Sequence, residues 1–144
     1  MYRQILVAPE HRKYQRILWR FSSEDPVSIY ALNTVTFGVV SAPYLAQRTL
    51  KQLTDEEKDF PLASNIVRES TYVDDILGAS DSLDEALFIR NQLICLLKKG
   101  GFELRKWLSN ERSLLSDLPE EHVYTGCPLI NGTQQNHIFL MSKY

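Results

Sequence analysis

The stretch Ser70-Thr71-Tyr72-Val73-Asp74-Asp75-Ile76-Leu77-Gly78 places two adjacent carboxylates inside an otherwise apolar run. The β-branched and aromatic residues around them favour extended backbone, whereas aspartate favours tight turns. We therefore predict a β-hairpin whose tip carries Asp74 and Asp75. Oxygen ligands suit Mg²⁺, which is usually held by one or two carboxylates together with substrate phosphates. The alternative from these residues alone is a solvated turn, because an Asp-Asp pair is common in turns.

The bulk composition is that of a globular protein. The chain has 144 residues, a formal net charge of −2, 44% hydrophobic residues and 24% charged residues. This length is sufficient for a domain with a core. No run approaches the ~18 apolar residues of a membrane span and no signal peptide is recognisable, so we expect no membrane partner. Two cysteines without a disulfide or metal spacing predict a reducing, intracellular location: the cytoplasm, the nucleus or an intracellular particle.

Charge is distributed unevenly along the chain. Residues 1–20 contain five lysines and arginines against the single acid Glu10, whereas acidic side chains gather at 55–59. A basic segment near a metal-binding acid pair would suit a polyphosphate or a nucleic acid. The alternative for the basic residues is a solvated charged face.

The segments around the acid pair predict an α+β fold. Residues 14–21 and 27–37 have the pattern of two strands in an antiparallel hairpin. A helix is predicted from 41 to about 58, and a shorter helical piece follows Pro61. The capping box Ser82-Leu83-Asp84-Glu85 begins a helix that Gly100-Gly101 ends, and 102–107 alternates like a strand. Strands and helices do not alternate as parallel crossovers require, so we expect an antiparallel sheet backed by helices.

Several side chains are assigned to the core or the surface from their local pattern. Trp19, Trp107 and Cys95 are expected in the core. The three histidines have no metal-ligand spacing and are expected on the surface: His11, His122 and His137. After 123 one strand is recognisable, at 138–141, and its pattern gives it no place in the core.

Three segments, in order along the chain, carry a resemblance to a known family. Thr36-Phe37-Gly38-Val39-Val40-Ser41-Ala42-Pro43-Tyr44-Leu45-Ala46 comes first, Tyr72-Val73-Asp74-Asp75 is central, and Gly100-Gly101-Phe102-Glu103-Leu104-Arg105-Lys106-Trp107-Leu108-Ser109-Asn110 follows. Together they resemble the palm region of reverse transcriptases from BEL/Pao-type long-terminal-repeat retrotransposons. The resemblance covers 1–118 and leaves 119–144 as a divergent or poorly ordered tail. It implies a palm-like sheet and an RNA-directed DNA polymerase, which is a nucleotidyltransferase.

The resemblance also implies roles for the residues that match the family's catalytic motifs. Asp74 and Asp75 correspond to the acids that hold two Mg²⁺ ions, for which Mn²⁺ can substitute. Lys106 corresponds to a lysine that protonates or stabilises the leaving pyrophosphate. From its own chemistry, Lys106 could equally be a solvated lysine at a strand edge.

Three further residues match positions that bind the incoming nucleotide in that family. Tyr2 resembles the gate that stacks under the sugar, and Phe37 and Gly38 resemble residues that line the nucleotide pocket. A packed aromatic remains the alternative for Tyr2. A turn before a helix remains the alternative for Gly38.

The chain also departs from the family pattern. The family's first palm motif contains a metal-binding aspartate before the gate tyrosine, whereas only Met1 precedes Tyr2. Fingers, primer grip, thumb and RNase H segments are not recognisable. We therefore expect a fragment that does not polymerise alone, and whose intact parent binds an RNA or DNA template–primer and deoxynucleoside triphosphates. The alternatives are a non-catalytic nucleic-acid- or protein-binding module derived from a palm, and a structural remnant.

Overall fold

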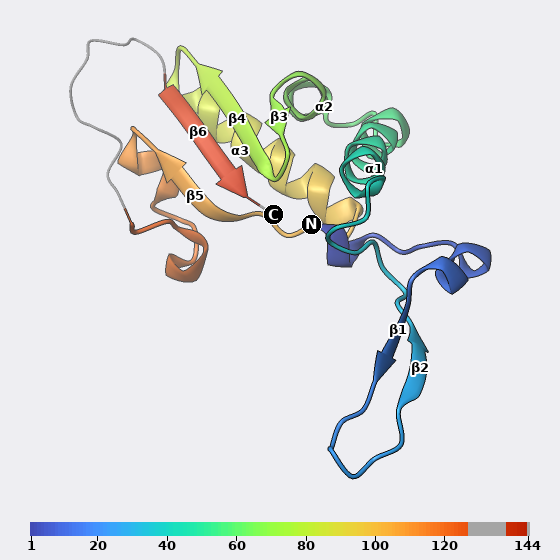
Figure 1. Cartoon of the computed structure of the whole chain (residues 1–144). Helices are drawn as coiled ribbons and strands as arrows, with labels where there is room; N and C mark the ends of the chain where they lie inside the picture. The colour runs from blue at the N-terminus through green and yellow to red at the C-terminus, as the bar shows by residue number, and fades with distance from the viewer. Residues whose placement is uncertain (127–137, 144) are drawn as a thin grey trace. The chain divides into compact units, whose positions relative to one another are not determined.

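The computed structural model describes residues 1–126 and 138–143, the second range by its backbone alone. The chain forms two compact units, Met1–Thr49 and Leu50–Tyr144. The structure has a two-stranded sheet in the first unit and a four-stranded sheet in the second, both antiparallel (Figure 1). Helices and antiparallel sheets thus combine as expected for the α+β class.

The first unit contains the predicted hairpin, formed by β1 (Arg16–Trp19) and β2 (Ser28–Ala31). The strands are shorter than the strand-like runs at 14–21 and 27–37. Every residue of both strands is exposed, because nothing in this unit covers either face of the hairpin. The expectation that Trp19 belongs to the core is therefore wrong, and its exposed fraction is 53%.

A small core lies at the base of this hairpin. Ile5 and Val35 are buried, and the Val35 N–H donates to the Ile5 carbonyl at 2.9 Å. Two 3₁₀ turns, Tyr2–Gln4 and Pro9–Tyr14, complete the first 14 residues.

The predicted helices are present. Helix α1 (Ala42–Glu56) begins in the first unit and ends in the second, and it buries one stripe at helical spacing: Ala42, Ala46, Leu50 and Leu53. Helix α2 (Pro61–Glu69) has its proline in the first turn, where no N–H is needed. Across the part of the chain that the structure describes, no helix is both long enough and apolar enough to cross a bilayer.

Helix α3 (Leu83–Lys99) begins and ends where the sequence predicts. The Ser82 hydroxyl accepts from the Glu85 N–H at 3.3 Å, whereas the Glu85 carboxylate accepts from the Ser80 hydroxyl at 2.6 Å, so the capping box is not reciprocal. The helix ends in a Schellman motif, in which Gly101 has φ +76°. Cys95 lies on the outer side of this helix and is exposed, so its expected place in the core is wrong.

The four-stranded sheet has the order β3-β4-β6-β5. Its strands are β3 (Thr71–Tyr72), β4 (Asp75–Ser80), β6 (Ile138–Lys143) and β5 (Arg105–Ser109). Helices α2 and α3 pack against it, and α3 lies behind β4 and β6 in Figure 1. Ile76, Leu96, Leu97 and Trp107 are buried in this unit, so Trp107 is the core aromatic that the sequence predicts.

Candidate active site at one end of the four-stranded sheet

The acid pair lies at a two-residue hairpin turn. Thr71 pairs with Ile76 and Tyr72 with Asp75, so Val73 and Asp74 form the loop. Such loops require positive φ, and Val73 has φ 54°. A β-branched residue in this region is an outlier, and strain of this kind costs about 1–3 kcal/mol. The prediction that the tip carries both acids is wrong by one residue, because the strand register makes Asp75 the first residue of β4.

The two acids are held on a packed scaffold. Asp74 and Asp75 are both half-buried, and Oδ1 of Asp75 is a buried atom. The Thr71 hydroxyl donates to the Val67 carbonyl at 2.8 Å, which ties the start of the hairpin to α2. Neighbouring carboxylates repel each other, and a cation between them and a phosphate would offset this repulsion.

Lys106 lies at an irregularity of the neighbouring strand β5. The register of β5 against β6 shifts between Arg105 and Leu108, and Lys106 has φ 57°. A bulge of this kind redirects a side chain relative to the regular strand. Lys106 is exposed and forms no salt bridge with any described side chain, whereas Arg105 binds Glu103 at 2.6 Å.

One strand brings the acid pair and Lys106 to the same end of the sheet. Asp75 and Arg105 both pair with Lys143 of β6, so two strand spacings, roughly 10 Å, separate their backbones. Figure 1 shows β4 and β5 beginning at the sheet end where β6 terminates. Among the residues whose backbone is described, the non-glycine residues with positive φ are Val73 and Lys106, and both lie at this end.

The three candidate nucleotide-binding residues lie together in the first unit. The rings of Tyr2 and Phe37 meet edge to face with their centroids 5.0 Å apart. Phe37 is 70% exposed, so much of its ring is available to another flat group. Gly38 has φ +83° and open space where a Cβ would stand. The backbone therefore favours glycine at this position for its conformation rather than for lack of room.

The donor set of the acid pair limits the metal that it can hold. Within 1–126 and 138–143 no group of three or more His, Cys, Asp or Glu side chains could hold a metal ion. Asp74 and Asp75 supply two carboxylates, which fits a Mg²⁺ ion whose coordination is completed by substrate phosphates. A pair of ions would need a further carboxylate from another segment.

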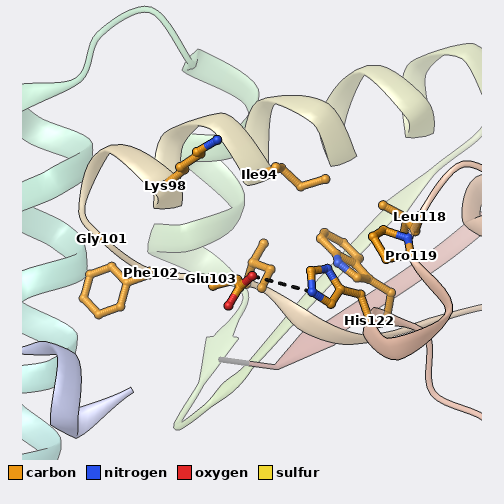
Figure 2. Close-up of a pocket in the computed structure, with 10 residues that line it drawn as sticks. Ile94, Lys98, Gly101, Phe102, Glu103, Leu118, Pro119 and His122 are labelled. Atoms are coloured by element: carbon orange, nitrogen blue, oxygen red, sulfur yellow. Dashed lines mark ion pairs between the residues drawn. The ribbon is translucent and has the colours of Figure 1, made fainter.

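A second concave site, which the sequence did not indicate, lies in the same unit between α3 and the segment after it. The pocket has a volume of about 440 Å³, within the range of small-molecule sites (Figure 2). It is lined by Ile94, Lys98, Gly101, Phe102, Glu103, Leu104, Trp107, Leu118, Pro119 and His122. The expectation that His122 is a surface residue is wrong, since its side chain is only 17% exposed. A single histidine without a second ligand at metal-binding spacing gives no local signal for such a place.

Neither the known protein families, nor the curated proteins, nor the solved structures contain a match to this chain. The interpretation of both sites therefore rests on their residues and their geometry.

Proposed function

We propose that this chain is the palm part of a BEL/Pao-type reverse transcriptase and acts in nucleotidyl transfer to a primer 3′-hydroxyl. The observation that supports this most directly is the shared pairing of Asp75 and Arg105 with Lys143, which puts the acid pair and Lys106 at one end of one sheet. Asp75 and Lys106 are far apart in sequence, so this convergence is a property of the fold. The positive φ of Val73 and Lys106 adds support, because backbone strain concentrates at functional sites.

Each residue would have a separate task in the reaction. The primer 3′-hydroxyl attacks the α-phosphorus of a deoxynucleoside triphosphate, the α–β phosphoanhydride bond breaks, and pyrophosphate leaves. Mg²⁺, when bound, lowers the pKa of the attacking hydroxyl and neutralises charge on the leaving group. Asp74 and Asp75 bind and orient the metal–triphosphate group. Lys106 supplies a proton or a positive charge to the pyrophosphate. In the family that the sequence resembles, Tyr2 corresponds to the residue that stacks under the sugar of the incoming nucleotide, and Phe37 and Gly38 correspond to residues that line the nucleotide pocket.

Binding of Mn²⁺ tests the acid pair directly. Electron paramagnetic resonance titrations with dTTP present should show Mn²⁺ binding that Asp74→Asn and Asp75→Asn each weaken. Asp59→Asn is the matched control, because Asp59 is an exposed acid between α1 and α2. Equal Mn²⁺ binding by all three variants would remove the basis for the proposed role of the pair.

Primer extension tests the reaction itself. The described residues offer no group of three acids for a metal, so we expect extension of oligo(dT) on poly(rA) only after fusion to a segment that carries a first-motif aspartate. Asp74→Asn should abolish that activity and Lys106→Met should reduce it by about 10²-fold or more. Activity in the fused protein that survives Asp74→Asn would contradict the proposal.

The exposed hairpin of the first unit favours a second candidate, a non-catalytic nucleic-acid-binding module. Trp19 and Phe21 meet edge to face with centroids 6.4 Å apart, and Phe21 and Tyr30 do so at 6.0 Å. Their exposed fractions are 53%, 80% and 39%. Two exposed arginines belong to the same hairpin: Arg16 begins β1, and Arg20 lies between Trp19 and Phe21 in the sequence. Aromatic rings beside arginines are the usual means of holding unpaired bases and backbone phosphates.

Fluorescence anisotropy with oligo(dT) and oligo(rA) over a series of salt concentrations separates the two candidates. A module should bind with strong salt dependence, and Trp19→Ala should weaken binding by about 1–3 kcal/mol, the usual contribution of one stacked base. Phe88→Ala is the control, because Phe88 is an exposed aromatic on α3 of the second unit. Binding without extension in the fused protein would favour the module, and extension would favour the polymerase.

A further inference from the structure

The pocket beside α3 is a separate site from the acid pair, since Asp74, Asp75 and Lys106 do not line it. Its floor is apolar: Phe102, Leu104 and Trp107 are 3%, 5% and 1% exposed. Its side wall is α3, where Ile94 and Lys98 lie one helical turn apart and so share a face. Cavities of this size with apolar walls and a few polar groups at the rim are typical sites for small organic molecules.

The charges at the rim select the class of ligand. Glu103 is already compensated by Arg105, whose guanidinium donates to it at 2.6 and 3.0 Å and thereby lowers the pKa of Glu103. On the same rim the His122 Nε2 lies 3.5 Å from a Glu103 oxygen. Lys98 has no salt bridge to a described side chain, whereas its neighbour Lys99 lies 3.9 Å from Glu57. Of the titratable side chains that line the pocket, Lys98 is therefore the one without a salt bridge to a described side chain.

We propose that this pocket binds a small apolar carboxylic acid, with its hydrocarbon part against Phe102 and Trp107 and its carboxylate at Lys98. Figure 2 shows the Lys98 amine on the α3 side of the pocket, away from the Glu103–His122 pair. The flexible stem of a lysine lets the ammonium follow a ligand anion at the rim. This site goes beyond the proposed polymerase function and does not depend on it.

Nuclear magnetic resonance titration of the full chain tests the proposal with three probes of one shape. These are 2-naphthoate, the neutral 2-naphthamide and the cationic 2-naphthylmethylammonium ion. The chain has two tryptophans, so the indole N–H of Trp107 reports on the pocket, and that of Trp19, exposed on the hairpin of the other unit, is the internal control. We expect 2-naphthoate to shift the Trp107 signal alone and to bind more tightly than either other probe.

Two lysine variants test the contribution of the Lys98 charge to binding, and an isoleucine variant tests the contribution of the cavity. Lys98→Met should weaken 2-naphthoate by about fivefold, as expected for a partly exposed ion pair, and leave the amide unchanged. Lys99→Met should leave both affinities unchanged. Ile94→Trp should fill the pocket and abolish binding of both probes. Absence of a Trp107 shift, an equal shift at Trp19, equal affinity for the acid and the amide, or no effect of Lys98→Met would each overturn the proposal.

Discussion

At the scale of single residues, the positions with positive φ fall into two groups: those whose residue type favours this conformation and those whose residue type opposes it. Gly38 and Gly101 have positive φ, and glycine adopts this conformation without steric cost. Val73 has positive φ against the preference of its β-branched side chain, and it lies between the exposed Tyr72 and the acid pair. The strain at Val73 is therefore tolerated only because the strands on both sides fix the turn.

Replacing Val73 should reveal this strain as a gain in stability. Val73→Gly should raise the free energy of unfolding by about 1 kcal/mol, because relief of the strained φ exceeds the added entropy of the unfolded chain. Val73→Ala is the control, since alanine keeps the unfavourable φ. Urea unfolding followed by the fluorescence of Trp107 in a Trp19→Phe background measures both variants. If glycine destabilised the protein as much as alanine, the strain would be absent.

Residue type alone could not place the aromatic and sulfur side chains. Trp19 and Trp107 both occur in segments with the pattern of a strand, yet Trp107 is buried and lines the pocket beside α3, while Trp19 is on an uncovered hairpin. Cys95 belongs to the apolar pattern of α3 but lies outside its buried stripe. In each case the burial of the side chain depends on which other segment of the chain covers it. The pattern of the neighbouring residues in the sequence does not contain that information.

At the scale of elements, a buried arginine connects α3 to the segment that follows β5. Arg90 is 2% exposed, and its guanidinium reaches both oxygens of Asp117 at 2.5 and 2.7 Å and the Leu114 carbonyl at 2.5 Å. The hydrogen bond from Arg90 is the largest cause of the lowered pKa of Asp117. A buried guanidinium without its partner is strongly unfavourable, so this contact should fix the 3₁₀ turn Arg112–Leu115 against the helix.

Acidification should remove this contribution. A carboxyl whose pKa is lowered by folding adds stability above its unfolded-state pKa, and that stability is lost as the pH falls through the folded-state pKa. Asp117→Asn should therefore destabilise the protein at neutral pH by about 1–2 kcal/mol, a modest value because Asp117 is partly solvated. The difference from the unaltered protein should shrink below about pH 4. Chemical denaturation at several pH values measures it, and a difference independent of pH would contradict the assignment.

The end of α3 provides a second test at this scale. Gly101 takes φ +76°, and its N–H donates to the Lys98 carbonyl at 3.0 Å. Gly101→Ala should cost about 1 kcal/mol, whereas Gly101→Asn should cost less, because asparagine tolerates the left-handed region. Open space surrounds this position, so a steric clash cannot explain a loss. Equal thermal midpoints for alanine and glycine would show that the motif does not depend on this conformation.

These helix ends were predictable because capping signals are local. Ser82, Gly100 and Gly101 mark the bounds of α3 within a residue. The sequence predicts a strand from 102 to 107, whereas β5 begins at Arg105. Phe102 and Leu104 are nevertheless buried and Glu103 is exposed, as their alternation indicates. Strand pairing begins only at Arg105, where β6 provides a partner. Alternation reports which face is buried, but strand bounds depend on a segment that is distant in sequence.

At the scale of the whole molecule, one of the two inner strands of the larger sheet is β6, which follows β4 and β5 in the sequence. Strand β6 separates β4 from β5 and pairs with both, and it thereby sets the common end at which Asp75 and Arg105 lie. The sequence indicates a strand at 138–141 but not its place, because register and order across a sheet arise from pairing between distant segments. Sequence motifs predict that Asp74, Asp75 and Lys106 are site residues. That the acid pair and Lys106 lie at the same end of one sheet follows only from the pairing of β4 and β5 with β6.

Removing 138–144 should therefore disrupt the strand pairing of the whole larger sheet and not merely shorten the sheet by one strand. Without β6, β4 would pair only with the two-residue β3, and β5 would have no strand partner; an isolated pair of strands is marginal in water. We expect loss of the cooperative thermal transition of the second unit and of hydrogen-exchange protection in β4 and β5. Replacing 17–30 by a short Gly-Ser linker is the control, because the exposed hairpin buries no side chain. If the shortened chain kept its transition while the linker variant lost it, β6 would not organise the sheet, and the common end of Asp75 and Arg105 would need another cause.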